Sequence, residues 1–251
     1  MEEEEMNVVG LMIGKKSSAG VPNKNISMVL GHRLCEYPLM AASGSKYINK
    51  VFVSTDSPII AEAGRSHGAE IIDRPHSLED PKTLTEDVLS HAYNVIVEER
   101  KEEVDFFVLL YSNGGFVNSE LIDDAIERLV ANPDFDSCVG TVSADMFTPI
   151  RAKRINDDGE LVPFVDLDVF GQFTSNRDSA GNVFFIDMSL QVLKPECFAR
   201  MDGNQEPFLW LGQKILPYEK AFGGDLDATW QYPVLEAWLK ENGPETVRKE
   251  E

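Results

Sequence analysis

Apolar and polar positions alternate along the first 143 residues in blocks that predict strands followed by helices. Five short runs are rich in apolar and β-branched residues and are predicted strands: Asn7–Ile13, Lys50–Ser54, Ala69–Ile72, Asp105–Leu110 and Ser137–Ser143. Four longer segments between them are predicted helices: Leu34–Ser43, Pro58–His67, Thr85–Glu98 and Ser119–Ala131. Strands that alternate with helices over short loops are typical of parallel βαβ crossovers. The pattern therefore predicts an α/β protein with a doubly wound, mostly parallel sheet, in which the very apolar run 105–110 lies centrally.

This rhythm breaks between about residues 146 and 182. Two short strand-like pieces around 151–155 and 161–164 precede a polar stretch without a clear period. Strand and helix patterns then resume at Val183–Asp187, Lys214–Tyr218 and Thr229–Lys240. We interpret residues 1–251 as a single domain that carries a small inserted lobe at about 146–182.

Charge and composition narrow the class of partners. The chain has 251 residues and a formal net charge of −20, and an anionic surface repels nucleic acids and acidic membranes. No apolar run reaches the roughly 18 residues of a membrane-spanning helix, and the acidic start Met1–Glu5 differs from the basic and apolar start of a signal peptide. The three cysteines lack metal-ligand spacing and are expected to be reduced thiols. We therefore expect a cytoplasmic protein that binds neither nucleic acid nor membranes.

The loop after the first strand is the first candidate binding site, because ligands of open α/β sheets lie beyond the carboxyl ends of the strands. Residues Gly14–Asn25 combine small residues, which let backbone N–H groups approach a phosphate, with Lys15, Lys16 and Lys24. In so acidic a chain, three lysines in one loop favour an anionic ligand over a merely solvated loop. The loop matches neither G-x-x-x-x-G-K-[ST] nor G-x-G-x-x-G.

A second candidate lies late in the chain, at Gly224-Asp225-Leu226-Asp227. Two aspartates in alternate positions of an extended segment point to the same side and are able to share a hard cation such as Mg²⁺. The alternative is that Asp227 only caps the helix predicted to begin near Thr229.

Five motifs occur in order along the chain: Gly20-Val21-Pro22-Asn23-Lys24-Asn25, Val53-Ser54-Thr55-Asp56, Arg74-Pro75, Thr148–Glu160 and Gly224-Asp225-Leu226-Asp227. Together they resemble the acylneuraminate (CMP-sialic acid) and CMP-octulosonate cytidylyltransferases. In that family the corresponding features are a G-x-P-x-K-N loop, a V-S-T-D strand end, an R-P step, an insertion lobe and a D-x-D that holds magnesium. The matches span nearly the whole chain. Asp56 itself either is a polar group of the site or caps the helix that starts near Pro58.

The resemblance implies a nucleotide-diphospho-sugar transferase-like, Rossmann-like fold and a magnesium-dependent transfer of CMP from CTP to an acidic sugar. In that reaction an acceptor hydroxyl attacks the α-phosphate of CTP and pyrophosphate leaves, so catalysis consists mainly of positioning and of neutralising charge. Asp225 and Asp227 are the implied Mg²⁺ ligands. The family likeness also implies a homodimer in which the inserted lobe of one subunit reaches towards the site of the other.

By the same resemblance, Lys24 contacts the α-phosphate and Asn25 lies beside it. Lys15 stands where the family usually has arginine and holds the triphosphate, although lysine lacks the bidentate fork of arginine. Gly14 contributes backbone at the start of the loop. With the two aspartates, these residues form the expected catalytic and nucleotide-binding set.

Further residues are assigned to the base and to the acceptor. Arg74 and a hydroxyl such as Thr85 are expected to read the cytosine or the ribose, with a surface ion pair as the alternative for Arg74. Arg151 and Arg177 of the inserted lobe are candidates for gripping the carboxylate of the acceptor. Packing of the lobe or dimer contacts are the alternative roles of both arginines.

The chain departs from the family pattern at several places. Ala19 stands where the family usually has lysine, Tyr111–Val117 replaces Q-P-T-S-P-L-R, and Gly181–Phe185 replaces an N-G-A-I-Y-like segment. The last two segments lie on the acceptor side in the family, so we expect an acceptor other than plain N-acetylneuraminate. The two glycines of the 111–117 segment suggest a roomier or differently shaped pocket.

We therefore predict a cytidylyltransferase that transfers CMP from CTP to an acidic 2-keto-3-deoxy sugar of the nonulosonic type. The altered segment 111–117 leaves open a nucleotidyltransferase that acts on a phosphonate or a sugar phosphate. Lys15 and Ala19 leave open a catalytically degenerate homologue that binds nucleotide without turnover, whereas the presence of Lys24, Asp225 and Asp227 speaks against it.

Overall fold

A seven-stranded sheet is the centre of the computed structural model, which describes residues 6–16, 21–80, 82–144, 147–176, 179, 181–224 and 226–248. The strand order is β11-β7-β10-β6-β1-β4-β5. The strands are β1 (Val8–Gly14), β4 (Ile48–Thr55), β5 (Glu70–Asp73), β6 (Phe106–Tyr111), β7 (Ser137–Ser143), β10 (Phe184–Leu193) and β11 (Ile215–Lys220). Neighbouring strands pair in parallel except at β10, which runs antiparallel between β6 and β7. The predicted α/β class and the mostly parallel sheet are confirmed.

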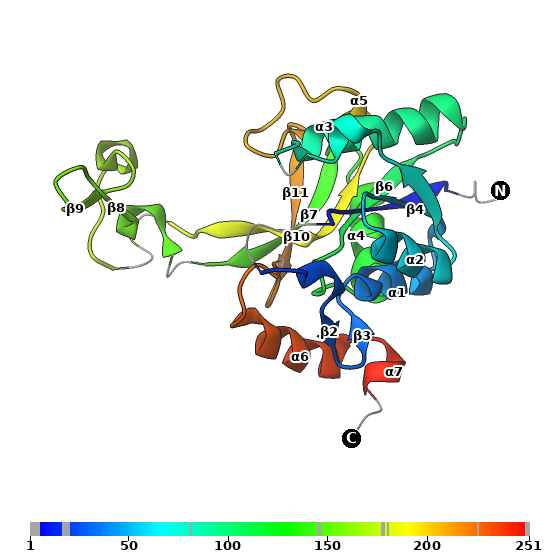
Figure 1. Cartoon of the computed structure of the whole chain (residues 1–251). Helices are drawn as coiled ribbons and strands as arrows, with labels where there is room; N and C mark the ends of the chain where they lie inside the picture. The colour runs from blue at the N-terminus through cyan, green and yellow to red at the C-terminus, as the bar shows by residue number, and fades with distance from the viewer. Residues whose placement is uncertain are drawn as a thin grey trace.

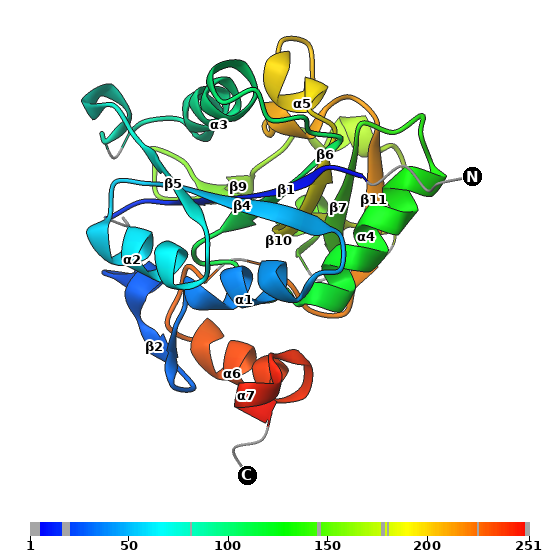
Figure 2. The same cartoon turned by 90° about the vertical axis from the view of Figure 1, so that its right-hand side faces the viewer.

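Helices cover both faces of this sheet (Figure 2). One face carries α1 (Glu36–Gly44), α2 (Pro58–Ser66) and α4 (Ser119–Ala131). The other carries α3 (Thr85–Tyr93), its π-helical continuation η3 (Asn94–Glu99), and α5 (Glu196–Ala199). No helix in the described ranges is both long and apolar enough to cross a membrane.

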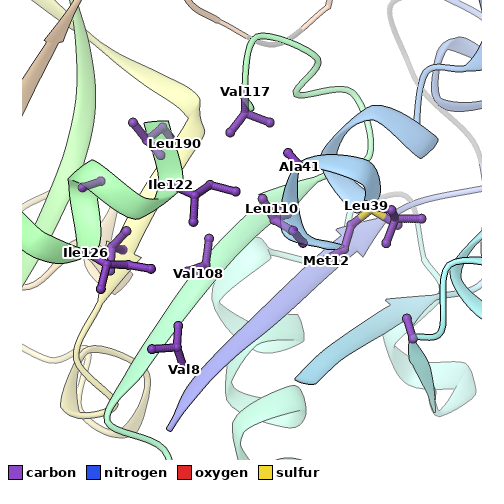
Figure 3. Close-up of a cluster of buried hydrophobic side chains, with 14 of the residues drawn as sticks. Val8, Met12, Leu39, Ala41, Val108, Leu110, Val117, Ile122, Ile126 and Leu190 are labelled. Atoms are coloured by element: carbon purple, nitrogen blue, oxygen red, sulfur yellow. The ribbon is translucent and has the colours of Figure 1, made fainter. Parts of the chain in front are cut away.

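Alternate residues of the central strands fill two separate cores. The core under α1, α2 and α4 receives from β1 and β6 the side chains of Val8, Met12, Val108 and Leu110 (Figure 3). The core under α3 and α5 receives from the same strands Val9, Leu11, Phe107 and Leu109. Because successive strand residues point to opposite faces, a strand covered on both sides must be apolar at every position. This explains why β6 reads as an uninterrupted hydrophobic run.

A third apolar cluster attaches the C-terminal helices α6 (Gln231–Asn242) and α7 (Glu245–Arg248) to the body. It joins Leu235 and Leu239 of α6 to Leu34, Tyr37 and Phe116. Beside it lies a hairpin of two-residue strands, β2 (Met28–Val29) and β3 (His32–Arg33), after the single 3-10 turn η1 (Lys24–Ile26). The sequence pattern does not predict the hairpin because its strands are too short to show a period.

Between β7 and β10 the chain leaves the sheet and forms an arm, residues 147–176 (Figure 1). The arm contains the turns η5 (Pro149–Arg151) and η6 (Leu167–Phe170) and the two-stranded sheet of β8 (Lys153–Ile155) and β9 (Leu161–Pro163). Its position is where the sequence predicts an inserted lobe. Large apolar side chains of the arm are exposed: Phe147, Ile155, Leu161, Phe164 and Val169.

Candidate active site

The carboxyl ends of the parallel strands meet at one edge of the sheet, and the predicted site residues follow those ends. Lys15 follows β1, Asp56 follows β4, Arg74 follows β5 and Ser112 follows β6. The loop between β11 and α6 brings Asp227 to the same edge, because its carboxylate meets Lys24. We call the described residues 221–224 and 226–228 of that loop the aspartate loop.

The side chain of Asn25 is hydrogen-bonded to the main chain of Lys15. The Asn25 Nδ2 group donates to the Lys15 carbonyl at 2.9 Å, and the Lys15 ammonium donates to the Thr83 carbonyl at 2.8 Å. Asn25 is only 8% exposed, yet its Oδ1 has no hydrogen-bond partner among the described residues. A buried acceptor without a partner is costly, so Asn25 is arranged to receive a donor from a ligand.

Lys15 and Arg74 are two partly or wholly buried cations at this sheet edge. Burial, reinforced by the positive charge of Arg74, lowers the pKa of Lys15, while Asp56 and Asp80 act in the opposite direction. Burial likewise lowers the pKa of Arg74. An anion bound near these two cations would favour their charged forms.

Arg74 is held from one side only. Its Nε donates to Ser54 Oγ at 3.0 Å and its Nη2 donates to the Ser54 carbonyl at 2.6 Å. Its Nη1 is buried without a partner among the described residues, although Arg74 as a whole is 8% exposed. The alternative of a surface ion pair is therefore wrong for Arg74. The guanidinium instead offers one fixed, unused donor to an acceptor of a ligand.

Lys24 forms an ion pair with Asp227. The Lys24 side chain is 10% exposed and that of Asp227 is 62% exposed, so the carboxylate remains accessible to solvent. The alternative role of Asp227 as a helix cap is wrong, because α6 has Trp230 at its N-cap without a side-chain bond. Instead Gln231 Oε1 accepts from the Asp227 backbone N–H at 2.7 Å. The other predicted metal ligand, Asp225, lies outside the described residues.

Local hydrogen bonds fix the turn that presents Lys24. The Ser27 hydroxyl donates to the Lys24 carbonyl at 2.6 Å, and the Tyr232 hydroxyl of α6 donates to Ser27 Oγ at 2.8 Å. The turn is thereby tied to the same helix that follows the aspartate loop. Lys24 and Asp227 are thus positioned relative to each other by α6.

Asp56 also contacts the first loop. Its carboxylate accepts from the Lys16 N–H at 2.7 Å. The α2 helix is capped by Ser57, whose hydroxyl accepts from Ile60 N. Capping by Asp56 is therefore wrong, whereas its role as a polar group of the site stays a prediction.

Close packing explains Gly14. A Cβ at this position would lie 1.9 Å from Ser112 Oγ, and that hydroxyl donates to the Ile13 carbonyl at 2.9 Å. The missing side chain makes room for Ser112. A contact of Gly14 with nucleotide stays a prediction.

The 111–117 segment is packed, not open. Residues 112–117 are buried. A Cβ on Gly114 would lie 3.2 Å from Ser189 Cα, and one on Gly115 would lie 2.9 Å from Leu235 Cδ1. The expectation that these glycines make a roomier pocket is therefore wrong, because both allow neighbouring chain to approach closely.

Three predicted residues remain: Thr85, Arg151 and Arg177. Thr85 begins α3, shortly after Thr83, whose carbonyl accepts from Lys15. Arg151 is exposed on the arm and donates to the Ser175 carbonyl at 2.8 Å, so this contact stays within the arm. Arg177 lies outside the described residues. The roles of all three stay predictions.

Sequence reasoning missed a buried ion pair beneath the aspartate loop. Asp187 of β10 accepts from the Lys220 ammonium of β11 at 2.5 Å, with Asp187 completely buried. The available signal was the charged residue Asp187 directly after the apolar run Val183–Ile186, which was interpreted only as the end of a strand.

A magnesium ion fits the chemistry of this edge. Among the described residues no three potential His, Cys, Asp or Glu ligands gather, and Asp227 offers one accessible carboxylate. Mg²⁺ in nucleotide enzymes is typically held by one or two carboxylates with substrate phosphates and water. One described carboxylate beside a lysine is therefore sufficient on the protein side, with Asp225 as the second candidate.

The fold thus brings cations and the accessible carboxylate of Asp227 together at one edge of an α/β sheet. A sequence model of the cytidylyltransferase family matches residues 15–170. The chain therefore belongs to the cytidylyltransferase family. The resemblance to this family, inferred from the ordered motifs, is confirmed.

Individual relatives are similar at modest identity. The bifunctional pseudaminic acid cytidylyltransferase and UDP-2,4-diacetamido-2,4,6-trideoxy-beta-L-altropyranose hydrolase of Helicobacter pylori is 30% identical over 198 residues, 78% of this chain and 36% of that protein. The CMP-N,N'-diacetyllegionaminic acid synthase of Legionella pneumophila is 27% identical over 199 residues, 77% of this chain and 83% of that protein. This chain spans about a third of the length of the first curated relatives it matches.

The solved structure of CMP:2-keto-3-deoxy-manno-octonic acid synthetase complexed with CTP shares the fold. Its TM-score is 0.66 at 14% identity, and the match covers 94% of this chain and 99% of that one. The Rossmann-like nucleotidyltransferase fold implied by the motifs is confirmed.

Proposed function

We propose that this chain transfers CMP from CTP to an acidic 2-keto-3-deoxy sugar of the nonulosonic type. A hydroxyl oxygen of the acceptor forms a bond to the α-phosphorus, the bond from that phosphorus to the bridging oxygen of pyrophosphate breaks, and the hydroxyl proton is released. The names of the relatives support this assignment, since they include a pseudaminic acid cytidylyltransferase and a CMP-N,N'-diacetyllegionaminic acid synthase.

The observation that carries the proposal is the meeting of Lys24 and Asp227 from opposite ends of the chain. A cation and an accessible carboxylate at one point provide charge for a phosphate and a ligand for a metal ion. Asn25, next to Lys24 in the chain, has an unused Oδ1 acceptor, and Arg74, which follows β5 at the same sheet edge, has an unused Nη1 donor. Such fixed, desolvated groups stabilise charge that develops during transfer without reorganising at that moment.

Each residue has a distinct task in this reaction. Lys24 contacts the α-phosphate, Asn25 positions the loop beside it, and Lys15 holds the triphosphate. Arg74, with Thr85 nearby, reads the base or the ribose. Discrimination between bases then follows from hydrogen-bond geometry, because a mismatched base leaves a buried donor unpaired.

Asp227 and Asp225 are proposed to hold Mg²⁺, which when bound supplies positive charge to the phosphate oxygens. The test is Mn²⁺ binding with CTP present, followed by electron paramagnetic resonance in the wild type and in Asp227→Asn. We expect the variant to bind Mn²⁺ at least about 10-fold more weakly, since it loses an anionic ligand. Undiminished Mn²⁺ affinity and rate in the variant would remove Asp227 from the metal site.

The protein is further proposed to be a cytoplasmic homodimer. The exposed apolar side chains of the arm, including Ile155, Leu161 and Phe164, support an interface, because exposed apolar patches commonly mark contact surfaces. In such a dimer Arg151 and Arg177 of one subunit would approach the acceptor at the other. Sedimentation equilibrium of the wild type and of Ile155→Asp with Leu161→Asp tests this, and a wild type that stays monomeric contradicts it.

The assay for the function itself is pyrophosphate release. CTP, ATP, GTP and UTP are each tested with magnesium and a panel of acidic nonulosonic sugars, sugar phosphates and phosphonates. We expect release with CTP and an acidic sugar only. Release with a phosphorylated acceptor alone would replace the proposed acceptor class. Silence together with undetectable CTP binding by calorimetry would overturn the proposed activity.

A further inference from the structure

A break in the register of β10 turns one carboxylate inward beneath the proposed site. The pairing of β10 with β7 shifts between Ile186 and Gln191, and irregularities of this kind re-aim side chains near active sites. Asp187 lies in the break and is completely buried. Its Oδ2 accepts from the Lys220 ammonium at 2.5 Å, and the Lys220 side chain is 4% exposed.

The Asp187 carboxylate also contacts the aspartate loop. Asp187 Oδ1 accepts from the Gly224 N–H at 2.6 Å. Gly223 passes so close that a Cβ there would lie 2.6 Å from Asp187 Cγ. The missing side chain of Gly223 thus lets the backbone pack directly on the carboxylate, and Gly224 has a φ of +115°, a conformation that favours glycine. Both residues lie directly before the aspartates proposed to bind magnesium.

The Lys220 ammonium contacts residues 111–117, which we call the acceptor-side segment. Lys220 Nζ donates to the Phe116 carbonyl and to Ser189 Oγ, and Ser189 Oγ lies 3.0 Å from the same carbonyl. A second link joins the two loops directly, because Leu226 N donates to the Asn113 carbonyl at 3.1 Å. Asp187 and Lys220 therefore connect the aspartate loop with residues 111–117.

Because the Asp187–Lys220 ion pair is buried, it is not expected to contribute much to the stability of the fold. Removing two charges from water costs as much as or more than their attraction returns, and apolar replacements of similar volume are often neutral for stability. What apolar side chains cannot supply is a fixed acceptor for the Gly224 N–H and a fixed donor for the Phe116 carbonyl.

We propose that Asp187 and Lys220 are positioning residues, which hold the aspartate loop in register with the acceptor-side segment. This inference rests on the proposed function for the meaning of the two loops. The pair itself touches neither nucleotide nor acceptor. It fixes the backbone next to Asp227 and so sets how strongly the metal and the triphosphate are held.

The test compares two double variants that remove both charges. Asp187→Asn with Lys220→Gln keeps an amide oxygen for Gly224 and amide donors towards Phe116. Asp187→Leu with Lys220→Met keeps the volume but offers no hydrogen bond. The matched control is Lys50→Met with Glu102→Leu, which deletes an ion pair of 2.5 Å at the opposite edge of the sheet.

Three readouts are taken on each folded protein: Mn²⁺ affinity with CTP present, steady-state rates, and hydrogen exchange of the aspartate loop without substrates. Thermal unfolding verifies that each variant is folded. In the leucine–methionine variant we expect Mn²⁺ affinity and kcat to fall about 10-fold or more, as for the loss of a hydrogen bond to a charged group, and loop exchange to quicken. In the asparagine–glutamine variant and the control, we expect values within about threefold of the wild type.

The proposal would be overturned if the leucine–methionine variant folds and its aspartate loop exchanges, and it binds Mn²⁺, as in the wild type. Equal losses in both double variants would overturn it as well, since charge and not loop position would then matter. If the wild type fails to release pyrophosphate, the proposed function fails. Hydrogen exchange still decides the positioning role in that case, because it needs no substrate.

Discussion

Lys24→Met separates the proposed catalytic role of Lys24 from a structural one. Methionine keeps the length and apolar stem of the side chain and removes only the ammonium. In the free protein that ammonium contacts Asp227, whose side chain is 62% exposed. After the substitution the carboxylate is simply hydrated, so no buried charge is left behind.

The structure therefore predicts a small cost in stability and a large cost in rate. A pair with one exposed partner contributes about 0–1 kcal/mol, which for a domain of this size is a shift in Tm of at most about 2–4 °C. Loss of a fixed donor to charge that develops in the transition state costs about 3–4 kcal/mol, or roughly 10²- to 10³-fold in kcat.

The assay is pyrophosphate release at saturating CTP and acceptor, with Tm measured on the same preparation. Lys46→Met is the control, because Lys46 pairs with Glu127 at 2.7 Å on the surface and lies before the amino end of β4, away from the site. We expect both variants to keep their Tm and only Lys24→Met to lose rate. A Lys24→Met enzyme with a kcat within about threefold of the wild type would refute the assignment. So would a Tm lowered by more than about 10 °C, which would show that the pair is structural.

Arg74→Lys keeps a charge but not the three-point geometry, so the KM for CTP should rise about 10- to 100-fold with little change in kcat; a CTP titration that leaves KM unchanged would contradict this. Gly14→Ala would place a Cβ 1.9 Å from Ser112 Oγ, and such overpacking should cost about 1–3 kcal/mol in denaturant unfolding. Adding Ser112→Gly should recover most of that loss, and no recovery would argue against the clash. Burial lowers the pKa of Lys15 below its ordinary value of 10.5. Lys15 should therefore lose its charge at a pH below 10.5, and CTP binding should weaken as the pH rises. Lys15→Met should flatten this alkaline limb in calorimetric titrations from about pH 7 to 10, and parallel losses in both proteins would exclude Lys15 as its source.

Regular elements were predictable where burial alone shapes the sequence. Ser119–Ala131 and Ser137–Ser143 are confirmed to the residue as α4 and β7. β10 was predicted to end at Asp187 but continues to Leu193. Its buried Asp187, Ser189 and Gln191 interrupt the apolar run, and only the fold shows that partners satisfy them. The antiparallel direction of β10 has no local signal either, since pairing is decided by distant strands.

Side chains of the candidate site were predictable from sequence motifs. The backbone groups that hold these side chains were not. Lys24 and Asp227 were both found from motifs, and the structure brings them together. By contrast, the Thr83 carbonyl that holds Lys15 and the Ser54 carbonyl that holds Arg74 have no residue signature, since every residue carries a carbonyl. Orientation of the site therefore depends on contacts that a linear sequence does not display.

The net charge of −20 is compatible with an anionic substrate because the cations of the site are placed where screening is weak. At physiological ionic strength, exposed charges act over only about 8 Å, so distant acidic side chains contribute little at the sheet edge. Lys24 and Arg74 are each 8% exposed, so water screens their charges less than it screens exposed charges. Affinity is thus set by a few buried cations and by the loops that aim them. Neutralising carboxylates far from the sheet edge should therefore leave the affinity for CTP nearly unchanged.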